Sequence, residues 1–324
     1  MAIADILFPI EENLEAFSKY YKSLFSTKVS LLSTVLSYIN KTGGKKIRPA
    51  LVLLSAGVNG TINERTYIGA SLVELLHNAT LVHDDVVDEA KERRGFPSIN
   101  SVWNNKTAIL VGDYLLGKGL LTAIERNENG FLKIISDSVK RMSEGELLAL
   151  EKSKNVELDE ETYLNIISNK TASLLSAGCK IGAESVGASE EVIQKMKLYG
   201  EFVGLAFQIK DDIFDYISNA NIIGKPTGND IKEKRITLPL VYVLKNVKKS
   251  ERIAILKIIK KKKIRKDEIA KIVDFVVNNG GIKYAQDKAE NYSLQAIEQI
   301  KDLPDNDYKE SLIDFAKYAI SRKK

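Results

Sequence analysis

Two short clusters of aspartates carry the clearest chemical signal in the sequence. Both have the spacing Asp-Asp-X-X-Asp, in LVHDDVVD and FQIKDDIFD, and their members are Asp84, Asp85 and Asp88, and Asp211, Asp212 and Asp215. Residues four apart lie on one face of a helix, so the first and last aspartate of each cluster point the same way. Carboxylate oxygens in this arrangement suit Mg²⁺, which keeps several waters and is usually completed by substrate phosphates. A solvated acidic helix end would look similar, but two clusters inside apolar helices favour metal.

Basic residues that could bind phosphate accompany the aspartates. Arg93 and Arg94 follow the first cluster, and GGKKIRP places Lys45 and Arg48 on a glycine-led turn that can approach phosphate closely. The cations of NKTASL and GKPTGNDIKEKR are Lys170, Lys225, Lys232, Lys234 and Arg235. Any one alone would be interpreted as a solvated surface charge. Together with the aspartates they predict a site for diphosphates bridged by Mg²⁺, where positive charge helps diphosphate leave.

Helices must position these residues. Apolar residues recur at spacings of three and four in YIGASLVELLHNATLVHDD, AILVGDYLLGKGLLTAI and LYGEFVGLAFQIKDDIFDYI, and no stretch alternates convincingly as a strand does. NENG at 127–130 and NNGG at 278–281 are typical of helix ends. Since no Pro/Gly/Ser-rich linker divides the chain, we predict one all-α domain over residues 1–324.

Composition narrows the class of protein. The chain has 324 residues, of which 44% are hydrophobic, so it can bury a large core. Its single cysteine, Cys179, excludes a disulfide framework and a thiolate metal cluster. The N-terminus lacks the features of a signal peptide, and no uninterrupted apolar run approaches the roughly 18 residues of a membrane span. We therefore expect a protein of the reducing cytoplasm.

The net charge of +5 is concentrated in one segment. Residues 245–266 contain eleven Lys or Arg and one acid, Glu251, so this segment carries +10 and the remainder −5. A solvated, Lys-rich helix face explains such a run best, and we expect no nucleic-acid partner. Peripheral contact with a membrane stays an alternative for this segment.

The motifs together resemble a known family. GGKKIRP, ELLHNATLVHDDVVDEAKERRG, GDYLL, KTASL, GLAFQIKDDIFD and GKPTGNDI occur over most of the chain in the order found in trans-isoprenyl diphosphate synthases, including medium- and long-chain members such as hexaprenyl diphosphate synthases. The resemblance implies the isoprenoid synthase fold, a single helical bundle around a deep central cavity, usually in a homodimer. It also implies a transferase that condenses isopentenyl diphosphate with an allylic diphosphate, such as farnesyl or geranylgeranyl diphosphate, using roughly two or three Mg²⁺ ions.

The same resemblance assigns roles to single residues. Both aspartate clusters would hold metal, with Asp211 the most direct ligand in the second. The groups implied to hold the allylic diphosphate are Arg93, Lys170, Lys225 and Arg235. Those implied to hold isopentenyl diphosphate are Lys45, Arg48, His77 and Arg94. Thr171 and Gln208 would face a developing carbocation.

Spacing supports two of these assignments, and three residues depart from the family pattern, of which Lys46 stands where many members have arginine. His77 precedes Asp84 by two helical turns and Gln208 precedes Asp211 by three residues, so each pair shares a helix face. A hydrogen-bonded core histidine is the alternative for His77. Glu146 stands where many members have glutamine. Lys234 replaces a common glycine, which puts the backbone geometry of that loop in question.

Residues before the first cluster bear on product length. Short-chain members resemble one another in carrying an aromatic residue four or five positions before the first aspartate, where this chain has Thr80 and Ala79. A deeper floor would be formed by Leu76 and by residues of neighbouring helices such as Leu164. We therefore expect a trans-polyprenyl product of more than about twenty carbons, with about thirty as the central expectation, although small residues also occur simply for tight packing. A geranylgeranyl or farnesylgeranyl diphosphate synthase is the alternative.

Two other functions are compatible with parts of the pattern. A terpene cyclase shares the chemistry of Mg²⁺ and aspartate, but it needs no second diphosphate site, so GGKKIRP and the Arg93–Arg94 pair argue against it. A non-catalytic regulatory subunit of a synthase could keep the fold without the chemistry. Two intact aspartate clusters argue against that reading.

Overall fold

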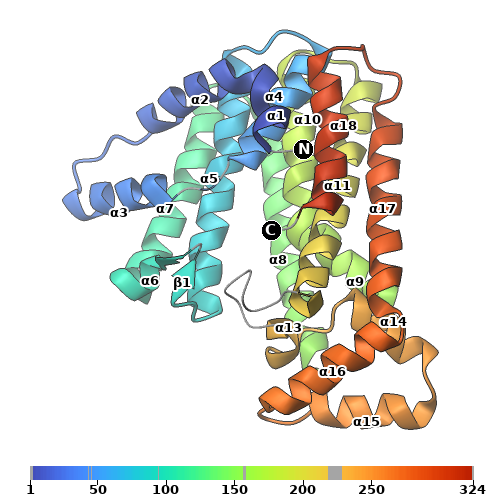
Figure 1. Cartoon of the computed structure of the whole chain (residues 1–324). Helices are drawn as coiled ribbons and strands as arrows, with labels where there is room; N and C mark the ends of the chain where they lie inside the picture. The colour runs from blue at the N-terminus through green and yellow to red at the C-terminus, as the bar shows by residue number, and fades with distance from the viewer. Residues whose placement is uncertain are drawn as a thin grey trace. The chain divides into compact units, whose positions relative to one another are not determined.

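Helices dominate the computed structural model, which describes residues 3–42, 44, 46–93, 95–155, 158–217 and 228–322 (Figure 1). The chain forms two compact units, each assembled from separate stretches. The first unit comprises Met1–Val139, Leu174–Lys197 and Asp302–Leu312, and the second comprises Lys140–Ser173, Leu198–Lys301 and Ile313–Lys324. The prediction of an all-α fold is confirmed. A single-domain organisation stays a prediction.

The elements up to residue 125 all belong to the first unit. They are α1 (Ile3–Leu7), η1 (Phe8–Ile10), α2 (Glu11–Ser23), α3 (Ser30–Thr42), α4 (Ile47–Asn59), α5 (Glu64–Val87), β1 (Glu92–Arg93), β2 (Phe96–Pro97), α6 (Ile99–Val102) and α7 (Asn105–Glu125). The remaining elements are α8 (Asn129–Asn155), α9 (Glu160–Ile167), the π-helical turn η2 (Ser168–Ala172), α10 (Ser173–Ser185), α11 (Glu190–Ile217), α13 (Asn229–Lys232), α14 (Leu238–Asn246), α15 (Lys249–Ile259), α16 (Lys266–Asn278), α17 (Gly281–Gln299) and α18 (Asp307–Ser321).

The first unit is built around α5. A capping box starts this helix, in which Thr66 N–H donates to Asn63 Oδ1 and Asn63 N–H donates to Thr66 Oγ1. Helices α4 and α7 pack along α5 (Figure 1). The approach of α7 is close because Gly112 has no side chain: a Cβ there would lie 2.1 Å from Nε2 of His83. The helix that carries the first aspartate cluster is therefore fixed by packing on several sides.

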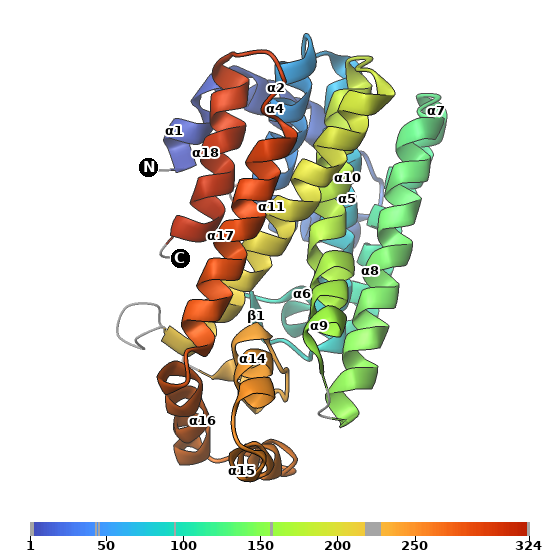
Figure 2. The ribbon, with the colours of Figure 1, turned by 90° about the vertical axis from the view of Figure 1, so that its right-hand side faces the viewer.

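The second unit packs α9, η2 and the C-terminal part of α11 against α17. Figure 2 shows α17 beside α11, and Ile209 of α11 shares one hydrophobic cluster with Ala285 and Ala289 of α17. A second cluster joins α14, α15 and α16, with Leu240, Ile259 and Ile272 among its members. The helix that carries the second aspartate cluster is thus held by the core of this unit.

Helix ends agree with the sequence, and a short hairpin was not expected. Both predicted stops contain a residue in the left-handed region, Asn127 with φ 56° and Gly280 with φ 77°. The strands β1 and β2 pair antiparallel over only two residues each, and Gly95 in their turn has φ 79°. Pairs this short are too brief to produce the alternation that predicts a strand.

One described helix, α7, is long and apolar enough to cross a membrane by length and composition. About a third of its most apolar window is buried inside the structure (33%). Core helices of soluble proteins pass the same test, so this is weak evidence for a membrane span. The charged residues Asp113 and Lys118 interrupt its apolar sequence.

Candidate active site

The first aspartate cluster occupies the last turn of α5. Asp84 is half-buried and Asp88, which caps the helix, is exposed. Asp85 is buried and turned to another side, where its Oδ1 accepts a hydrogen bond from Nε of Arg93 at 2.6 Å. Burial raises the pKa of Asp85, and the Arg93 guanidinium opposes this rise. Asp84 and Asp88 therefore differ from Asp85, which is placed to orient Arg93.

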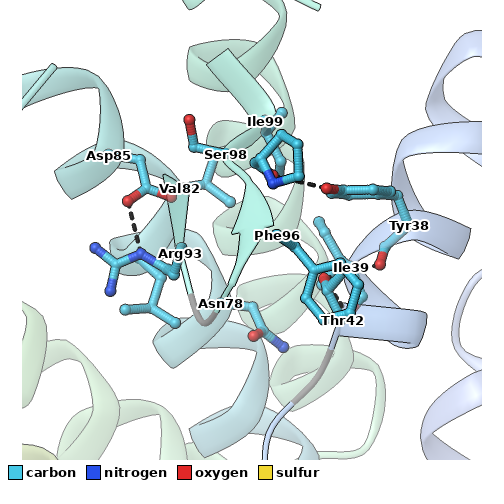
Figure 3. Close-up of a pocket in the computed structure, with 12 residues that line it drawn as sticks. Tyr38, Ile39, Thr42, Asn78, Val82, Asp85, Arg93, Phe96, Ser98 and Ile99 are labelled. Atoms are coloured by element: carbon cyan, nitrogen blue, oxygen red, sulfur yellow. Dashed lines mark hydrogen bonds and ion pairs between the residues drawn. The ribbon is translucent and has the colours of Figure 1, made fainter. Parts of the chain in front are cut away.

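The hairpin that carries Arg93 is tied to α3. Figure 3 shows the Asp85–Arg93 pair at one edge of a pocket formed by α3, α5 and the hairpin. On the other side of this pocket, Tyr38 of α3 donates a hydrogen bond of 2.7 Å to the carbonyl oxygen of Pro97. The hairpin that carries Arg93 thus contacts two helices, α5 through Arg93 itself and α3 through Pro97.

In the second cluster, Asp212 ends a chain of hydrogen bonds. Thr171 Oγ1 donates to Gln208 Oε1 at 2.9 Å, and Gln208 Nε2 donates to Asp212 Oδ1 at 2.8 Å. The hydroxyl of Tyr163 donates to the other carboxylate oxygen of Asp212 at 2.6 Å. The structure therefore brings together three residues that the motifs had selected. Tyr163 was missed, because an aromatic residue in the apolar pattern of α9 suggests only core packing.

Asp215 is engaged by the backbone of the following short helix. Its carboxylate accepts the N–H groups of Asn229 at 2.9 Å and of Asp230 at 3.0 Å, so it caps α13. Asp230, which the motif analysis had not selected, lies close enough to repel the buried Asp212 carboxylate. Burial followed by this repulsion raises the pKa of Asp212 to about 8, and burial with repulsion from Asp215 raises that of Asp230 to about 7.

Asp211, the expected primary metal ligand, contacts the end of the chain. Nη2 of Arg322 donates to Asp211 Oδ1 at 2.7 Å and to the carbonyl oxygen of Phe207 at 3.0 Å. The guanidinium also stacks 3.7 Å from the centroid of the Phe207 ring, and its side chain is only 7% exposed. No local pattern could predict this pair, because 111 residues separate its members.

Removing this guanidinium is expected to strengthen the binding of divalent cations. Because a metal and Arg322 compete for the same carboxylate, Arg322→Ala should lower the dissociation constant for Mn²⁺ or Mg²⁺ by up to about tenfold. Titration calorimetry or Mn²⁺ electron paramagnetic resonance measures this without turnover. Arg322→Lys keeps a charge and should fall between the two. Weaker metal binding in Arg322→Ala would show that Arg322 supports the site instead of competing for it.

Lys170 and Thr171 lie in the π-helical turn η2. The Lys170 ammonium forms an ion pair with Oε2 of Glu146 on α8. The sequence singled out Glu146 only as a departure from the family pattern. In the structure it contacts Lys170, a residue predicted to bind diphosphate. Single π-turns are frequent at functional sites, which fits the roles implied for Lys170 and Thr171.

The loop after the second cluster keeps the geometry that a glycine would favour. Lys234 adopts a left-handed conformation with φ 60°, so the lysine is accommodated where its family position commonly has glycine. Arg235 is exposed, pairs with Glu233 at 3.2 Å and donates its backbone N–H to the Asp230 carbonyl at 2.7 Å. At Lys234 the backbone therefore has a conformation that favours glycine, and the lysine adopts it.

The predicted residues for isopentenyl diphosphate are only partly described. Arg48 is half-buried in the first turn of α4, and His77 is buried on α5 two turns before Asp84. Lys45, Arg94 and Lys225 lie outside the residues that the structure describes.

The residues expected to set product length are divided between the units. Leu76 and Ala79 are buried on α5, and the Thr80 hydroxyl donates to the His77 carbonyl at 3.0 Å. Ala79 stands in one helical row with Leu75 and His83, both of which lie against glycines of α7, so Ala79 also faces α7. Leu164 packs against the hydrophobic cluster of the second unit.

The carboxylates fit a metal that takes few protein ligands. Among the described residues, no group of three or more His, Cys, Asp or Glu side chains is gathered as a metal site. Mg²⁺ is usually held by one or two carboxylates and completed by water and substrate phosphates. Asp84 with Asp88, and Asp211 beside the mutually repelling Asp212 and Asp230, are donor sets of that kind.

These buried acids predict how stability depends on pH. The folded-state pKa of Asp212 lies near 8, above the value of about 3.9 expected in the unfolded chain, so the folded state retains a proton that the unfolded state releases. The metal-free protein should therefore lose stability as pH rises from about 4 to about 8. Melting temperatures across this range test the slope, and Asp212→Asn should flatten it. An equal slope in both proteins would contradict the assignment.

Comparison with known proteins places these features in one family. The family model described as "Polyprenyl synthetase" matches residues 29–276. The all-trans-nonaprenyl-diphosphate synthase (geranyl-diphosphate specific) of Rhodobacter capsulatus is 33% identical over 319 residues, covering 98% of this chain and 97% of that protein. A decaprenyl diphosphate synthase structure from Rhodobacter capsulatus matches with a TM-score of 0.93 at 30% identity and full coverage of both chains (100%). A polyprenyl synthase from Caulobacter crescentus CB15, crystallised with calcium and isoprenyl diphosphate, matches with a TM-score of 0.90 at 28% identity, covering 100% of this chain and 98% of that one.

Proposed function

This chain belongs to the polyprenyl synthetase family, and we propose that it extends an allylic diphosphate by repeated condensation with isopentenyl diphosphate. Members of the family are transferases that use these two substrates and depend in general on Mg²⁺. The observation that carries the proposal is that each unit combines an aspartate cluster with a basic side chain that a carboxylate holds in place. In the first unit this is Arg93 held by Asp85, and in the second it is Lys170 beside the Thr171–Gln208–Asp212 chain.

The residues of this chain would bind and orient the substrates. Bound Mg²⁺, in two or three ions held through Asp84, Asp88 and Asp211, would supply positive charge to the departing diphosphate. Arg93 and Lys170 would bind the allylic diphosphate. Lys225 and Arg235, which follow the second cluster in the sequence, would help to bind it. Arg48 and His77, together with Lys45 and Arg94, would bind isopentenyl diphosphate. Asp85 would act by orienting Arg93.

The reaction then needs no nucleophilic side chain. The bond between the allylic carbon and the diphosphate oxygen breaks, and the double bond of isopentenyl diphosphate forms the new carbon–carbon bond with the resulting cation. A proton is lost from the added unit to the released diphosphate. Thr171 and Gln208 present polar atoms to the developing positive charge, held in place by Asp212. The apolar helices keep water away from the cation.

For the product, we propose a trans-polyprenyl chain of more than about twenty carbons, with about thirty as the central value. Ala79 and Thr80 place no aromatic ring before the first cluster, and the helix rise of 1.5 Å per residue puts them about 6–7.5 Å along α5 from Asp84. The relatives named above as nonaprenyl and decaprenyl diphosphate synthases make long chains, which supports the direction. Geranylgeranyl or farnesylgeranyl diphosphate is the alternative product.

We also propose that the protein is a cytoplasmic homodimer. One side of α7 exposes apolar side chains that a second copy could cover, namely Ile109, Leu110, Leu120, Leu121 and Ile124. Exposed apolar patches of this kind commonly mark protein interfaces. Sedimentation equilibrium at the mass of two chains would support the dimer.

The exposed basic side chains in and beside α15 offer peripheral contact with an anionic membrane, where a polyprenyl product would be soluble.

Product analysis tests the function directly. The purified protein is incubated with Mg²⁺, isopentenyl diphosphate and geranyl, farnesyl or geranylgeranyl diphosphate, and the dephosphorylated products are sized by chromatography. We expect chains longer than the primer, and none when a chelator removes the metal. Hydrocarbon formed without isopentenyl diphosphate would indicate a cyclase. Absence of any product with all primers would favour the regulatory subunit.

The two arginines after the first cluster should separate by substrate. Arg93→Ala should raise KM for the allylic diphosphate and Arg94→Ala should raise KM for isopentenyl diphosphate, each by about ten- to a hundred-fold, because a charge-assisted phosphate contact is lost. Arg93→Ala also leaves Asp85 buried without this partner, so the double variant with Asp85→Asn serves as control. Equal effects of both arginine variants on both substrates would contradict the assignment.

A further inference from the structure

An ion pair between two neighbouring helices lies at the start of the π-helical turn that carries Lys170 and Thr171. The pair joins Arg141 of α8 to Glu201 of α11, and neither residue belongs to the motifs. We propose that Arg141 and Glu201 are positioning residues, which fix the register in which Lys170 and Thr171 are presented to the allylic substrate. This inference rests on the proposed function for the identity of that substrate.

The guanidinium of Arg141 reaches both the partner helix and the turn. Nη2 and Nη1 donate to the two carboxylate oxygens of Glu201 at 2.8 and 3.3 Å. Nε donates to Asn169 Oδ1 at 2.9 Å, and Nη2 also donates to Ser168 Oγ at 2.9 Å. The Ser168 hydroxyl in turn donates to Glu201. Arg141 thus contacts the first two residues of η2, and Glu201 contacts the first.

Close contacts with α8 and α11 on either side restrict movement of the turn along the helix axis. A Cβ on Gly145 of α8 would lie 2.9 Å from Cβ of Asn169 and 3.0 Å from the backbone nitrogen of Lys170. A Cβ on Gly204 of α11 would lie 2.5 Å from Cα of Ala172. Both helices therefore touch the turn directly. The ion pair joins these two helices at the point where the turn begins.

The same two helices receive the side chains that the turn presents. Lys170 pairs with Glu146 of α8, and Thr171 donates to Gln208 of α11. A π-turn contains one more residue than an α-helical turn, so its relaxation to α-helix would change the direction of the side chains within and beyond the turn, by up to about 100°. Lys170 and Thr171 would then lose both contacts. Arg141 and Glu201 accordingly act on the substrate through these residues, without touching it.

A purely structural ion pair would behave differently. Both side chains are mostly shielded, with 23% of Arg141 and 15% of Glu201 exposed, and breaking such a pair lowers stability whatever its role. A positioning pair must in addition change the binding of one substrate more than the other. The pair between Lys288 and Glu160, at 2.8 Å and with exposures of 31% and 24%, provides a matched control in the same unit.

The experiment compares Arg141→Lys, Glu201→Gln and the control Lys288→Gln in the full-length protein. Lysine keeps the charge of Arg141 but cannot donate to Glu201, Ser168 and Asn169 together. Measurements are KM for each substrate, kcat, the melting temperature, and hydrogen exchange of peptides covering residues 163–175. The charge-swapped protein with Arg141→Glu and Glu201→Arg tests for rescue.

We expect Arg141→Lys and Glu201→Gln to raise KM for the allylic diphosphate by about ten- to a hundred-fold, while KM for isopentenyl diphosphate changes by less than about threefold. Amides of residues 168–172 should exchange faster in these two variants only, and the swap should recover part of the loss. If both variants lose melting temperature as Lys288→Gln does, with KM and exchange of the turn unchanged, the pair is merely structural and the inference is wrong. A wild-type protein that forms no prenyl product would instead overturn the proposed function, and hydrogen exchange would still decide whether the pair holds the turn.

Discussion

Alanine in place of Asp84 or Asp211 is expected to lower turnover by at least about a hundred-fold, because each carboxylate would help to hold Mg²⁺ against a departing diphosphate. Both side chains are half-buried on their helices and neither belongs to a hydrophobic cluster, so the fold should survive. Asp211→Ala should melt at a lower temperature than Asp84→Ala, because it leaves the shielded Arg322 guanidinium without this carboxylate. Turnover at saturating Mg²⁺ and both substrates measures the effect, and circular dichroism checks that the variants remain helical.

Two exposed aspartates outside the clusters serve as controls. Asp137 lies on α8 in the first unit and Asp274 on α16 in the second. Alanine at either position removes one carboxylate of the same unit without touching a cluster, and turnover should be unchanged. Undiminished turnover in Asp84→Ala or Asp211→Ala would remove the central hypothesis about the clusters.

The helices and the main acidic residues could be predicted because their signals are local. Apolar spacing, together with stops at Asn127 and Gly280, defines helices through contacts within a few residues. The shared face of Asp84 and Asp88 follows from the helix repeat in the same way. The contact of Asp85 with Arg93 could not be predicted in this way, because it depends on how the hairpin folds back.

Contacts between distant segments could not be predicted from local patterns. Arg322 meets Asp211 across 111 residues, and Tyr163 meets Asp212 across 49. Neither pair has a spacing rule, since tertiary packing alone brings them together. The π-turn is also invisible in the sequence, because SNKTA has no composition that distinguishes a π-turn from an α-helical turn. The contacts of Arg322 and Tyr163 contribute to the electrostatics of the second cluster, together with burial and repulsion from Asp230.

Phenylalanine in place of Ala79 is expected to shorten the product to about fifteen to twenty carbons while condensation continues. The reacting groups would be untouched, since Ala79 lies about 7.5 Å along α5 from Asp84 at 1.5 Å per residue. In the structure Ala79 is fully buried and lies on the side of α5 that faces α7. If the growing chain passes this side, as proposed, a ring at position 79 would block it. Chromatography of the dephosphorylated products measures the change.

Overpacking is the competing effect, and a graded series separates it from blockage. An added ring in a filled core costs about 1–3 kcal/mol of stability without a systematic change in product. Blockage predicts that Ala79→Val, Ala79→Leu and Ala79→Phe shorten the product progressively, whatever their melting temperatures. Leu76→Ala, which removes a buried side chain one turn deeper, should lengthen it. Unchanged product length in a folded and active Ala79→Phe variant would mean that the growing chain follows a path that does not pass Ala79.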